Sequence, residues 1–420
     1  MGTHTQPRVV VIGGGFGGLE AAFYTRMKVG DRAAMTLVSD QDHFLFKPNT
    51  IYVPFGLDPA ELTIPLDRPT SRKGIRLVQG KASVIDTVSR TVTAGGEDIP
   101  YDHLVVATGA SMRAEEIPGM AEHAYMIWTP EEMLRLRVGF DGLLVAADAG
   151  KERRVLFLVP PRNKCSGPLY EMVMMLDSWL RQHHARSKVN ITWSTYEQGY
   201  IQAFGPRLNT LVSSEFDRRG IVGHRGYAVS RIEPNEVVYA NGETLGFDLL
   251  VAFPPYVAAT TFAGLPSDDR GFIATDLATR RVRGLDNVFA VGDAGDFPVK
   301  QAFLAFLQAD AAADAIASDI LGEKPSVAFD PISMCVMEQF DTATFAQVPL
   351  RLKDNGTAVE VRPDAGNAYR VGSSPVWRLG KKLLGVYLPW RFGAGEPFHA
   401  GAPWKGMEVG LKMMSAAMAS

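Results

Sequence analysis

Cysteine is scarce in this 420-residue sequence, which contains only Cys165 and Cys335. Two cysteines so far apart exclude a fold held together by a disulfide framework. The eight histidines form no HxxxH or similar cluster, so we predict no metal site. An excess of basic residues is also missing, because the formal net charge is −3. This balance argues against a nucleic-acid partner.

Long hydrophobic runs are absent as well. No stretch reaches the ~18 apolar residues that a membrane-spanning helix requires. The segment before the first predicted strand, residues 1–7, offers no room for a signal peptide. We therefore expect a chain that starts in the cytoplasm and does not cross a bilayer. Hydrophobic residues make up 46% of the sequence, which is enough for two or three domains with their own cores.

A glycine-rich turn connects a predicted buried strand, residues 8–12, to a helix that begins near residue 19. Gly13, Gly15 and Gly18 satisfy the G-x-G-x-x-G spacing in this strand–turn–helix context. The first glycine allows a tight turn, the second lets the backbone approach a pyrophosphate, and the third lets the helix pack on the strand. The free N–H groups of the helix N-terminus would then bind the phosphates.

The position expected for a ribose-binding acid departs from the usual pattern. The second predicted strand covers residues 34–38. Ser39 occupies the place of the acid directly after it, and Asp40 follows. Either side chain could contact a ribose.

Two further segments favour FAD over NAD as the bound dinucleotide. A predicted strand ends in Thr108-Gly109, and another ends in Gly292-Asp293. An aspartate at the carboxyl end of a strand can bind the ribityl chain or bridge to phosphate, although it could also serve as a turn residue. The helix that begins near Gln301 would aim its positive end at the flavin ring, where reduced flavin carries negative charge.

A second strand–helix unit begins at residues 153–159, but its phosphate loop is replaced. Pro160 and Pro161 lack N–H donors and have a fixed φ, which disfavours NAD(P)H binding. Cys165 lies in this loop, just before a helix predicted over residues 167–180. The helix dipole and the neighbouring bases Arg162 and Lys164 are expected to lower its thiol pKa. Such a loop predicts thiol chemistry on the flavin.

The chain resembles the sulfide:quinone oxidoreductases, which fall within the flavin disulfide reductase superfamily. The resemblance extends over about residues 7–400. Its carriers are Gly13-x-Gly15-x-x-Gly18, Ala107-Thr-Gly109, Lys164-Cys-Ser-Gly-Pro-Leu-Tyr-Glu171, Val291-Gly-Asp293 and Met334-Cys-Val-Met-Glu338. The stretch around Cys165 is the most specific of these, whereas the glycine loop is shared by many flavoproteins.

The resemblance implies a reaction and roles for particular residues. Cys165 and Cys335 would form a redox pair on one face of the FAD, sulfide would be oxidised to polysulfide, and two electrons would pass to a membrane quinone. Lys300 matches a family lysine near the flavin and the quinone. Glu171 is a candidate proton acceptor, although a glutamate near a helix start needs no function. The aromatic residues Phe306, Tyr387 and Trp390 are candidates for quinone stacking.

The sequence also departs from the family. Many members carry a third cysteine in the segment aligned with residues 126–129, where this chain has Trp128. A mechanism that needs three thiols is therefore excluded. Residues 44–54 contain no cysteine for a thioether, so the FAD is expected to be held without that link.

The C-terminal region mixes bulky apolar and basic residues. Residues 376–390 have apolar residues at helical spacing, but Pro389 and two glycines weaken them as one helix. A second periodic segment runs from Trp404 to Met418. We expect these helices to lie in a membrane interface as a monotopic, peripheral membrane anchor. The alternative is packing on the protein core or on a sister subunit of a homo-oligomer.

Together these patterns predict an α/β fold with two Rossmann-like dinucleotide-binding domains and a C-terminal α+β membrane-interface region. The FAD-binding domain is expected at residues 1–115 and 246–325, split by the second domain at 116–245, with the C-terminal region at 326–420. Three other functions stay open: a type II NADH:quinone dehydrogenase, a flavin subunit like that of flavocytochrome c sulfide dehydrogenase, and a non-enzymatic flavin/thiol redox sensor.

Overall fold

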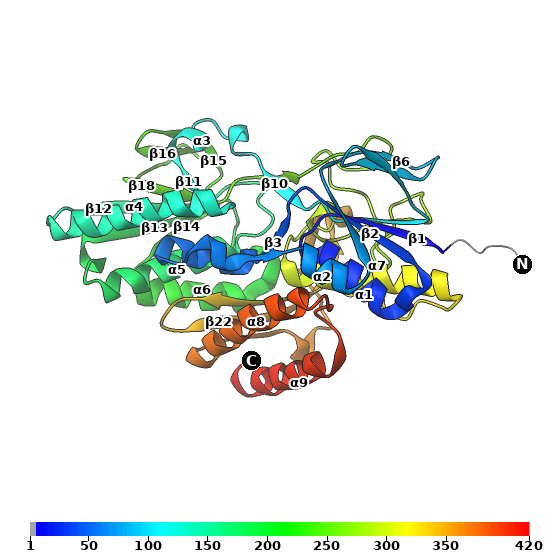
Figure 1. Ribbon diagram of the computed structural model, residues 1–420. Helices are drawn as coiled ribbons and strands as arrows, with labels where there is room; N and C mark the ends of the chain where they lie inside the picture. The colour runs from blue at the N-terminus through cyan, green and yellow to red at the C-terminus, as the bar shows by residue number, and fades with distance from the viewer. Residues whose placement is uncertain (1–5, 420) are drawn as a thin grey trace, which may run out of the picture.

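The computed structural model describes residues 6–419. The expectation that no signal peptide is present rests mainly on residues 1–5, which lie outside the described residues. Two α/β lobes lie side by side, and the C-terminal helices run along one side of them (Figure 1).

The first lobe is built on a parallel five-stranded sheet in the order β20-β9-β1-β2-β5. Its strands read as nearly continuous runs of valine, isoleucine and leucine, which is typical of strands buried on both faces. Their bounds are β1 (Arg8–Ile12), β2 (Ala34–Ser39), β5 (Ile75–Gln79), β9 (His103–Val106) and β20 (Val288–Ala290).

Both faces of this sheet are covered. Helices α1 (Phe16–Val29) and α7 (Ala302–Leu321) pack together on one face. The other face packs against an antiparallel three-stranded sheet of β6 (Ala82–Asp86), β7 (Thr91–Ala94) and β8 (Glu97–Pro100). Between β2 and β5 the chain forms the β3–β4 pair and α2, at His43–Leu45, Thr63–Pro65 and Asp67–Arg72.

The second lobe repeats this plan. Its parallel sheet has the order β11-β18-β12-β13-β14, with bounds Tyr125–Met126, Leu249–Ala252, Arg153–Val159, Val189–Thr195 and Val222–Arg225. One face is covered by α4 (Pro130–Asp148), α5 (Gly167–Gln182) and α6 (Gly205–Arg219). The other is covered by β15 (Val229–Glu233), β16 (Glu236–Tyr239) and β17 (Thr244–Gly246).

All strands of the second sheet lie in the sequence between β9 and β20, so the first lobe is completed only after the second one is built. The chain crosses between the lobes through the antiparallel pair β10 (Ala110–Met112) and β19 (Tyr256–Ala258). The predicted fold class, with two Rossmann-like parallel sheets, is thereby confirmed.

The C-terminal region is an antiparallel sheet with two helices. Its strands are β21 (Ile332–Glu338), β22 (Ala343–Lys353), β23 (Ala358–Val361) and β24 (Arg370–Ser374), followed by α8 (Pro375–Gly393) and α9 (Gly401–Met418). Helix α8 is continuous, contrary to the expected weakening at Pro389. The burial of Trp377, Leu388 and Phe392 on its inner face compensates for the missing backbone hydrogen bond.

The two C-terminal helices use their apolar residues differently. On α9, Leu411, Met414 and Met418 pack against Phe345 and Trp377, so this face lies on the protein. The expectation that this face of α9 contacts lipid is therefore wrong, because the face packs against Phe345 and Trp377 instead. On α8 an apolar stripe remains exposed, formed by Val376, Leu379, Leu383, Val386 and Trp390. Within residues 6–419, no helix combines the length and the hydropathy needed to span a bilayer.

Candidate active site

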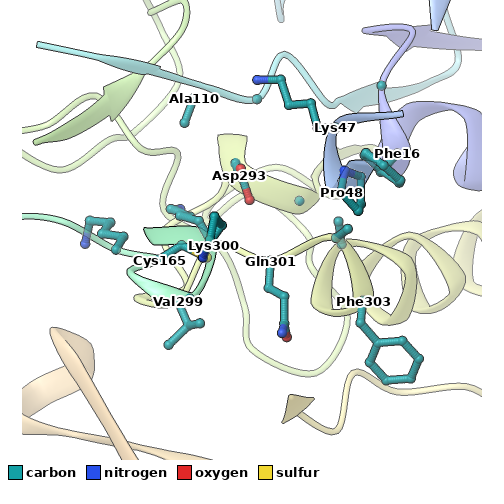
Figure 2. Close-up of a pocket in the computed structure, with 18 of the residues that line it drawn as sticks. Phe16, Lys47, Pro48, Ala110, Cys165, Asp293, Val299, Lys300, Gln301 and Phe303 are labelled. Atoms are coloured by element: carbon teal, nitrogen blue, oxygen red, sulfur yellow. The ribbon is translucent and has the colours of Figure 1, made fainter. Parts of the chain in front are cut away.

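One cavity of about 1510 Å³ brings the glycine-rich turn and both cysteines together. It lies where the carboxyl ends of β1, β9 and β12 face the N-termini of α1, α5 and α7. Ligands of open parallel sheets bind at such strand ends. Figure 2 shows residues from these separate segments around it, among them Phe16, Lys47, Cys165 and Asp293.

The glycine turn fits a pyrophosphate. A Cβ on Gly13 would lie 2.2 Å from the carbonyl oxygen of Ala107, and one on Gly18 would lie 1.8 Å from the carbonyl oxygen of Gly13. Gly15, in contrast, has no neighbour within 4 Å of its Cβ position, so its open side leaves room for a ligand. No side chain caps the N-terminus of α1, and its N–H groups stay available to phosphate oxygens.

The other predicted dinucleotide contacts also line the cavity. The hydroxyl of Ser39 donates to the carbonyl oxygen of Gln41 at 2.7 Å, whereas Asp40 is exposed. The buried hydroxyl of Thr108 has no hydrogen-bond partner among the described residues. Gly109 and Gly292 have φ of +76° and +64°, which other residues rarely adopt.

Asp293 is a half-buried residue whose carboxyl group lines the cavity (Figure 2). Burial raises its pKa, and the nearby ammonium groups of Lys300 and Lys47 partly offset this rise. Within residues 6–419 no donor forms a hydrogen bond to it, which suits a carboxylate that binds ligand hydroxyls.

Lys47 is a site residue that the sequence reasoning missed. Its Nζ lies 3.2 Å from the centre of the Trp128 ring, and burial lowers its pKa to about 8. Trp128 lies where the family resemblance implied a third cysteine in many members, and in this chain it forms a cation–π pair with Lys47. Only the departure at Trp128 was visible in the sequence, because the contact depends on the tertiary fold.

Cys165 is held by an ordered loop after β12. Its N–H donates to Asn163 Oδ1 at 3.0 Å, and Asn163 Nδ2 donates to the carbonyl oxygen of Phe253 at 2.9 Å. Pro160 and Pro161 come first in this loop and offer no N–H groups to a phosphate.

Cys335 lies on β21, where its neighbours contact the start of α7. Gln301 Nε2 donates to the carbonyl oxygen of Met334 at 3.2 Å, and the hydroxyl of Ser333 donates to Gln301 Oε1 at 2.9 Å. Both cysteines are free, partly accessible and open on the same cavity. They are close enough that a charge on Cys335 raises the pKa of Cys165.

The expectation of a lowered thiol pKa for Cys165 is wrong. Burial raises its pKa well above the usual range, and the charges of Asp293 and Cys335 raise it further. The neighbouring bases point elsewhere: Arg162 pairs with Glu116 at 3.4 Å, and Lys164 Nζ lies 5.4 Å from the Phe272 ring. Burial also raises the pKa of Cys335 to about 12.

Lys300 adjoins the cavity, but its ammonium group points into the protein. Nζ donates to the carbonyl oxygen of Gly295 and lies 3.8 Å from the centre of the Phe272 ring. Burial lowers its pKa to about 7. Its backbone N–H donates to the carbonyl oxygen of Lys164 at 3.1 Å and ties the Cys165 loop to the α7 loop. Lys300 is thus better placed to hold this loop than to contact a ligand directly.

Glu171 forms a buried ion pair with Lys381 from α8, a second residue that the sequence reasoning missed. Burial raises the pKa of Glu171, and the Lys381 charge opposes the rise. The same two groups act on Cys335, whose pKa is raised by Glu171 and lowered by Lys381. Glu171, Lys381 and Cys335 all line the same cavity.

An aromatic wall closes the other end of the cavity. We use this name for Phe303, Phe306, Phe398 and Trp404, which all line it. Phe306 stacks on Phe398 with ring centres 4.6 Å apart. Tyr387 and Trp390, which were also predicted to stack on a quinone, do not line the cavity. Trp390 is 56% exposed on α8, and the hydroxyl of Tyr387 donates to the carbonyl oxygen of Phe398 at 3.3 Å.

Comparison with known proteins first finds a similarity to a broad class of oxidoreductases. The sequence model of the pyridine nucleotide-disulphide oxidoreductase family matches residues 7–145. This segment contains the glycine turn and the strand that ends in Thr108-Gly109, and the match indicates a flavin cofactor.

More specific similarities lie within this class. The chain is 34% identical to the "Sulfide-quinone reductase" of Aquifex aeolicus over 244 residues, covering 56% of this chain and 55% of that protein. It is 26% identical to the "Type II NADH:quinone oxidoreductase NdhA" of Mycobacterium tuberculosis, covering 68% and 66%. The chain therefore matches between half and two thirds of the length of these relatives.

The fold is also shared with a solved structure. The X-ray structure of the sulfide:quinone oxidoreductase from Aquifex aeolicus superposes with a TM-score of 0.85, covering 97% of this chain and 96% of that one, at 24% identity. The resemblance that the sequence predicted is confirmed.

Proposed function

We propose that this protein oxidises sulfide to polysulfide, using bound FAD and a membrane quinone as the electron acceptor. The single observation that carries the proposal is that Cys165 and Cys335, the only cysteines of the sequence, open on one cavity together with the glycine turn. The sequence similarity to the sulfide-quinone reductase of Aquifex aeolicus supports it.

Different residues of the cavity would bind different parts of FAD. Gly13, Gly15 and Gly18 would hold the pyrophosphate of FAD, and Asp293 would hold its ribityl hydroxyls. When bound, FAD would supply a two-electron acceptor for the thiols and a two-electron donor for the quinone. Lys47 would provide a cation on the side of Trp128.

The sulfur chemistry needs a bridge between the cysteines. In the oxidised protein, hydrosulfide would attack the Cys165–Cys335 bridge, forming one new S–S bond while the bridge breaks and the other sulfur leaves as a thiolate. Because burial disfavours a free thiolate, the leaving sulfur must be stabilised or protonated. The Glu171–Lys381 pair would hold and return that proton at Cys335.

The NADH-oxidising alternative is disfavoured by the loop around Cys165. Pro160 and Pro161 remove two N–H donors where a dinucleotide phosphate would bind, and the thiol of Cys165 takes up part of that space. The quinone would instead enter along the aromatic wall, from the side of α8 and α9.

An anaerobic spectroscopic experiment tests the proposed function. We expect sulfide to bleach the flavin absorbance of the purified protein rapidly, NADH to leave it unchanged, and a soluble quinone to restore it. Bleaching by NADH at a rate similar to that by sulfide would reject the proposal in favour of the dehydrogenase alternative.

Two variants serve as controls. Cys165→Ser and Cys335→Ser should each retain FAD, since neither thiol contributes to the glycine turn, but should lose at least about 100-fold in the rate of sulfide-driven bleaching. Retention of the full rate in either variant would mean that this cysteine is structural.

A further inference from the structure

Two buried carboxyl groups and a partly buried histidine form a cluster behind the aromatic wall. Glu20 lies on α1, Asp310 on α7 and His399 on the segment between α8 and α9. One oxygen or nitrogen atom from each lies within 4.8 Å of those of the other two. We call these three residues the acid–histidine cluster. Nothing in the proposed FAD or cysteine chemistry uses it.

Only part of the cluster is explained by structural bonds. Glu20 accepts hydrogen bonds from the backbone N–H groups of Phe398, at 2.6 Å, and His399, at 3.1 Å. His399 Nδ1 lies 2.6 Å from Asp310 Oδ2. Asp310 Oδ1 and His399 Nε2 are buried without any partner among the described residues. Buried polar atoms without a hydrogen-bond partner are uncommon and destabilise the fold, so these two atoms need an explanation.

A shared proton explains the geometry better than a metal ion does. Ligands at about 2.0–2.2 Å from one zinc ion are more than about 3 Å apart in a tetrahedral site. The 2.6 Å contact between His399 Nδ1 and Asp310 Oδ2 is instead a short hydrogen bond. Two buried carboxyl groups this close cannot both be ionised without a large cost, so the cluster retains a proton.

The cluster contacts the aromatic wall through the ring of His399. The ring of His399 lies 4.5 Å from that of Trp404 and 5.4 Å from that of Phe303, both members of the aromatic wall. His399 is only partly buried, and the first turn of α9 that follows it, at residues 401–403, is exposed.

Other charged or titratable side chains face the cluster from the helices that pack around it. They are Tyr24 and Lys28 on α1, Asp314 on α7, Tyr387 and Arg391 on α8, and Glu408 on α9. Lys28 pairs with Asp314 at 3.1 Å, and Arg391 donates to the carbonyl oxygens of Pro397 and Ala400. Neither Lys28 nor Arg391 forms an ion pair with the cluster. The negative charge of the two carboxyl groups is therefore reduced by the proton that the cluster retains.

We propose that the acid–histidine cluster is a proton donor for the acceptor that binds at the aromatic wall, with His399 as the residue that passes the proton on. This inference rests on the proposed function. Conversion of a quinone to a quinol takes up two electrons and two protons. Hydrosulfide supplies both electrons and releases one proton as it becomes sulfane sulfur, so each turnover takes one net proton from water. The cluster would deliver this proton and regain it through the first turn of α9.

The oxidative half-reaction of the FAD-loaded protein tests the proposal. Burial raises the pKa of Asp310 to about 8 and also raises that of Glu20, so the Asp310 carboxyl is protonated below about pH 8 and loses its proton above it. Flavin reoxidation by a soluble quinone should therefore slow as the pH rises through about 8. In Asp310→Asn and His399→Gln it should be at least about 10-fold slower, without this pH dependence. Ferricyanide, which accepts electrons without protons, should reoxidise the variants at the normal rate.

A control acid is available one turn further along α7. Asp314→Asn removes a buried carboxylate that bonds Lys28 and the N–H groups of Ser326 and Val327. This variant should lose stability but retain a pH-dependent reoxidation rate, with the profile moved to lower pH because the Asp314 charge raises the pKa of Asp310. Equal quinone reoxidation by Asp310→Asn and the unmodified protein, or a stoichiometric divalent cation at the cluster, would overturn the proposal.

A measurement without turnover separates this proposal from the proposed function. Infrared spectra of the resting protein should contain a band of a protonated carboxyl group that disappears in Asp310→Asn. If this band is missing, the proton donor is rejected even when sulfide reduces the flavin. If the band is present but sulfide fails to reduce the flavin, the proposed function is rejected and the cluster still holds its proton.

Discussion

At the scale of single residues, burial decides the chemistry of the two thiols. Each lies in a site whose desolvation disfavours the thiolate, and this effect exceeds any stabilisation from the start of α5. The consequence is protective, because a thiol that is rarely ionised resists alkylation and adventitious oxidation. In the proposed reaction, sulfide would therefore attack the bridge between the cysteines and would not react with a free thiolate.

Thiol labelling measures this directly. In the reduced protein, alkylation of Cys335 should rise about tenfold for each pH unit between about pH 7 and about pH 10, because its pKa of about 12 lies above that range. An ordinary exposed thiol, with a pKa near about 8.5, would level off within this range. A plateau near pH 8 in mass-spectrometric labelling would contradict the assigned burial. Labelling of a small-molecule thiol in the same samples controls for the reagent.

At the scale of elements, the helix that follows Cys165 is tied to the hairpin that follows Cys335. Arg219 at the end of α6 is the link. Its guanidinium donates to Asp177 on α5 at 3.1 Å, and to Gln339 and Asp341 at the β21–β22 turn at 2.9 and 2.6 Å. The arginine is almost fully buried, so its bonds are poorly screened.

Loss of this link should destabilise the whole chain. Arg219→Met leaves Gln339 Oε1 without its donor, removes one of the three arginines that pair with Asp177, and should reduce the free energy of unfolding by about 3 kcal/mol. The neighbouring Arg218 pairs with Glu215 and Asp341 at the surface, so Arg218→Met should cost less than about 1 kcal/mol. Chemical denaturation of both variants gives the comparison. Equal losses would mean that the buried network contributes no more than the surface pairs.

The elements also show what a sequence can and cannot predict. The glycine turn was predictable because Gly18 is required by its contact with Gly13 within one strand–turn–helix unit, and Gly13 by its positive φ of +113° in the turn. The direction of Lys300 was not, because it depends on Phe272 and Gly295, which loops of the first lobe bring alongside it. Lys47 and Lys381 were missed for the same reason. Their partners, Trp128 and Glu171, are distant in the sequence and meet them only in the tertiary structure.

At the scale of the whole molecule, α8 connects an exposed surface to the cavity. Its outer face carries the apolar stripe, from Val376 to Trp390. Its inner face carries Arg378, which pairs with the buried Glu338 at 2.7 Å, and Lys381, which pairs with Glu171. A surface that binds this helix would therefore lie close to the aromatic wall and to Cys335, as delivery of a lipophilic acceptor requires.

Lipid binding through the apolar stripe can be tested with two paired variants. Leu379 and Leu383 are 58% and 60% exposed, so Leu379→Asp with Leu383→Asp should leave the free energy of unfolding nearly unchanged. Burial of a leucine stabilises by about 1.5–3 kcal/mol, so the double variant should bind anionic phospholipid vesicles about 100-fold more weakly. The matched control is Val138→Asp with Val145→Asp on α4 of the second lobe. These two valines are 70% and 71% exposed. Vesicle sedimentation should separate the two pairs. Equal binding by the α8 variant and the unmodified chain would show that the stripe does not contact lipid, and a loss in the α4 variant would point to a different surface.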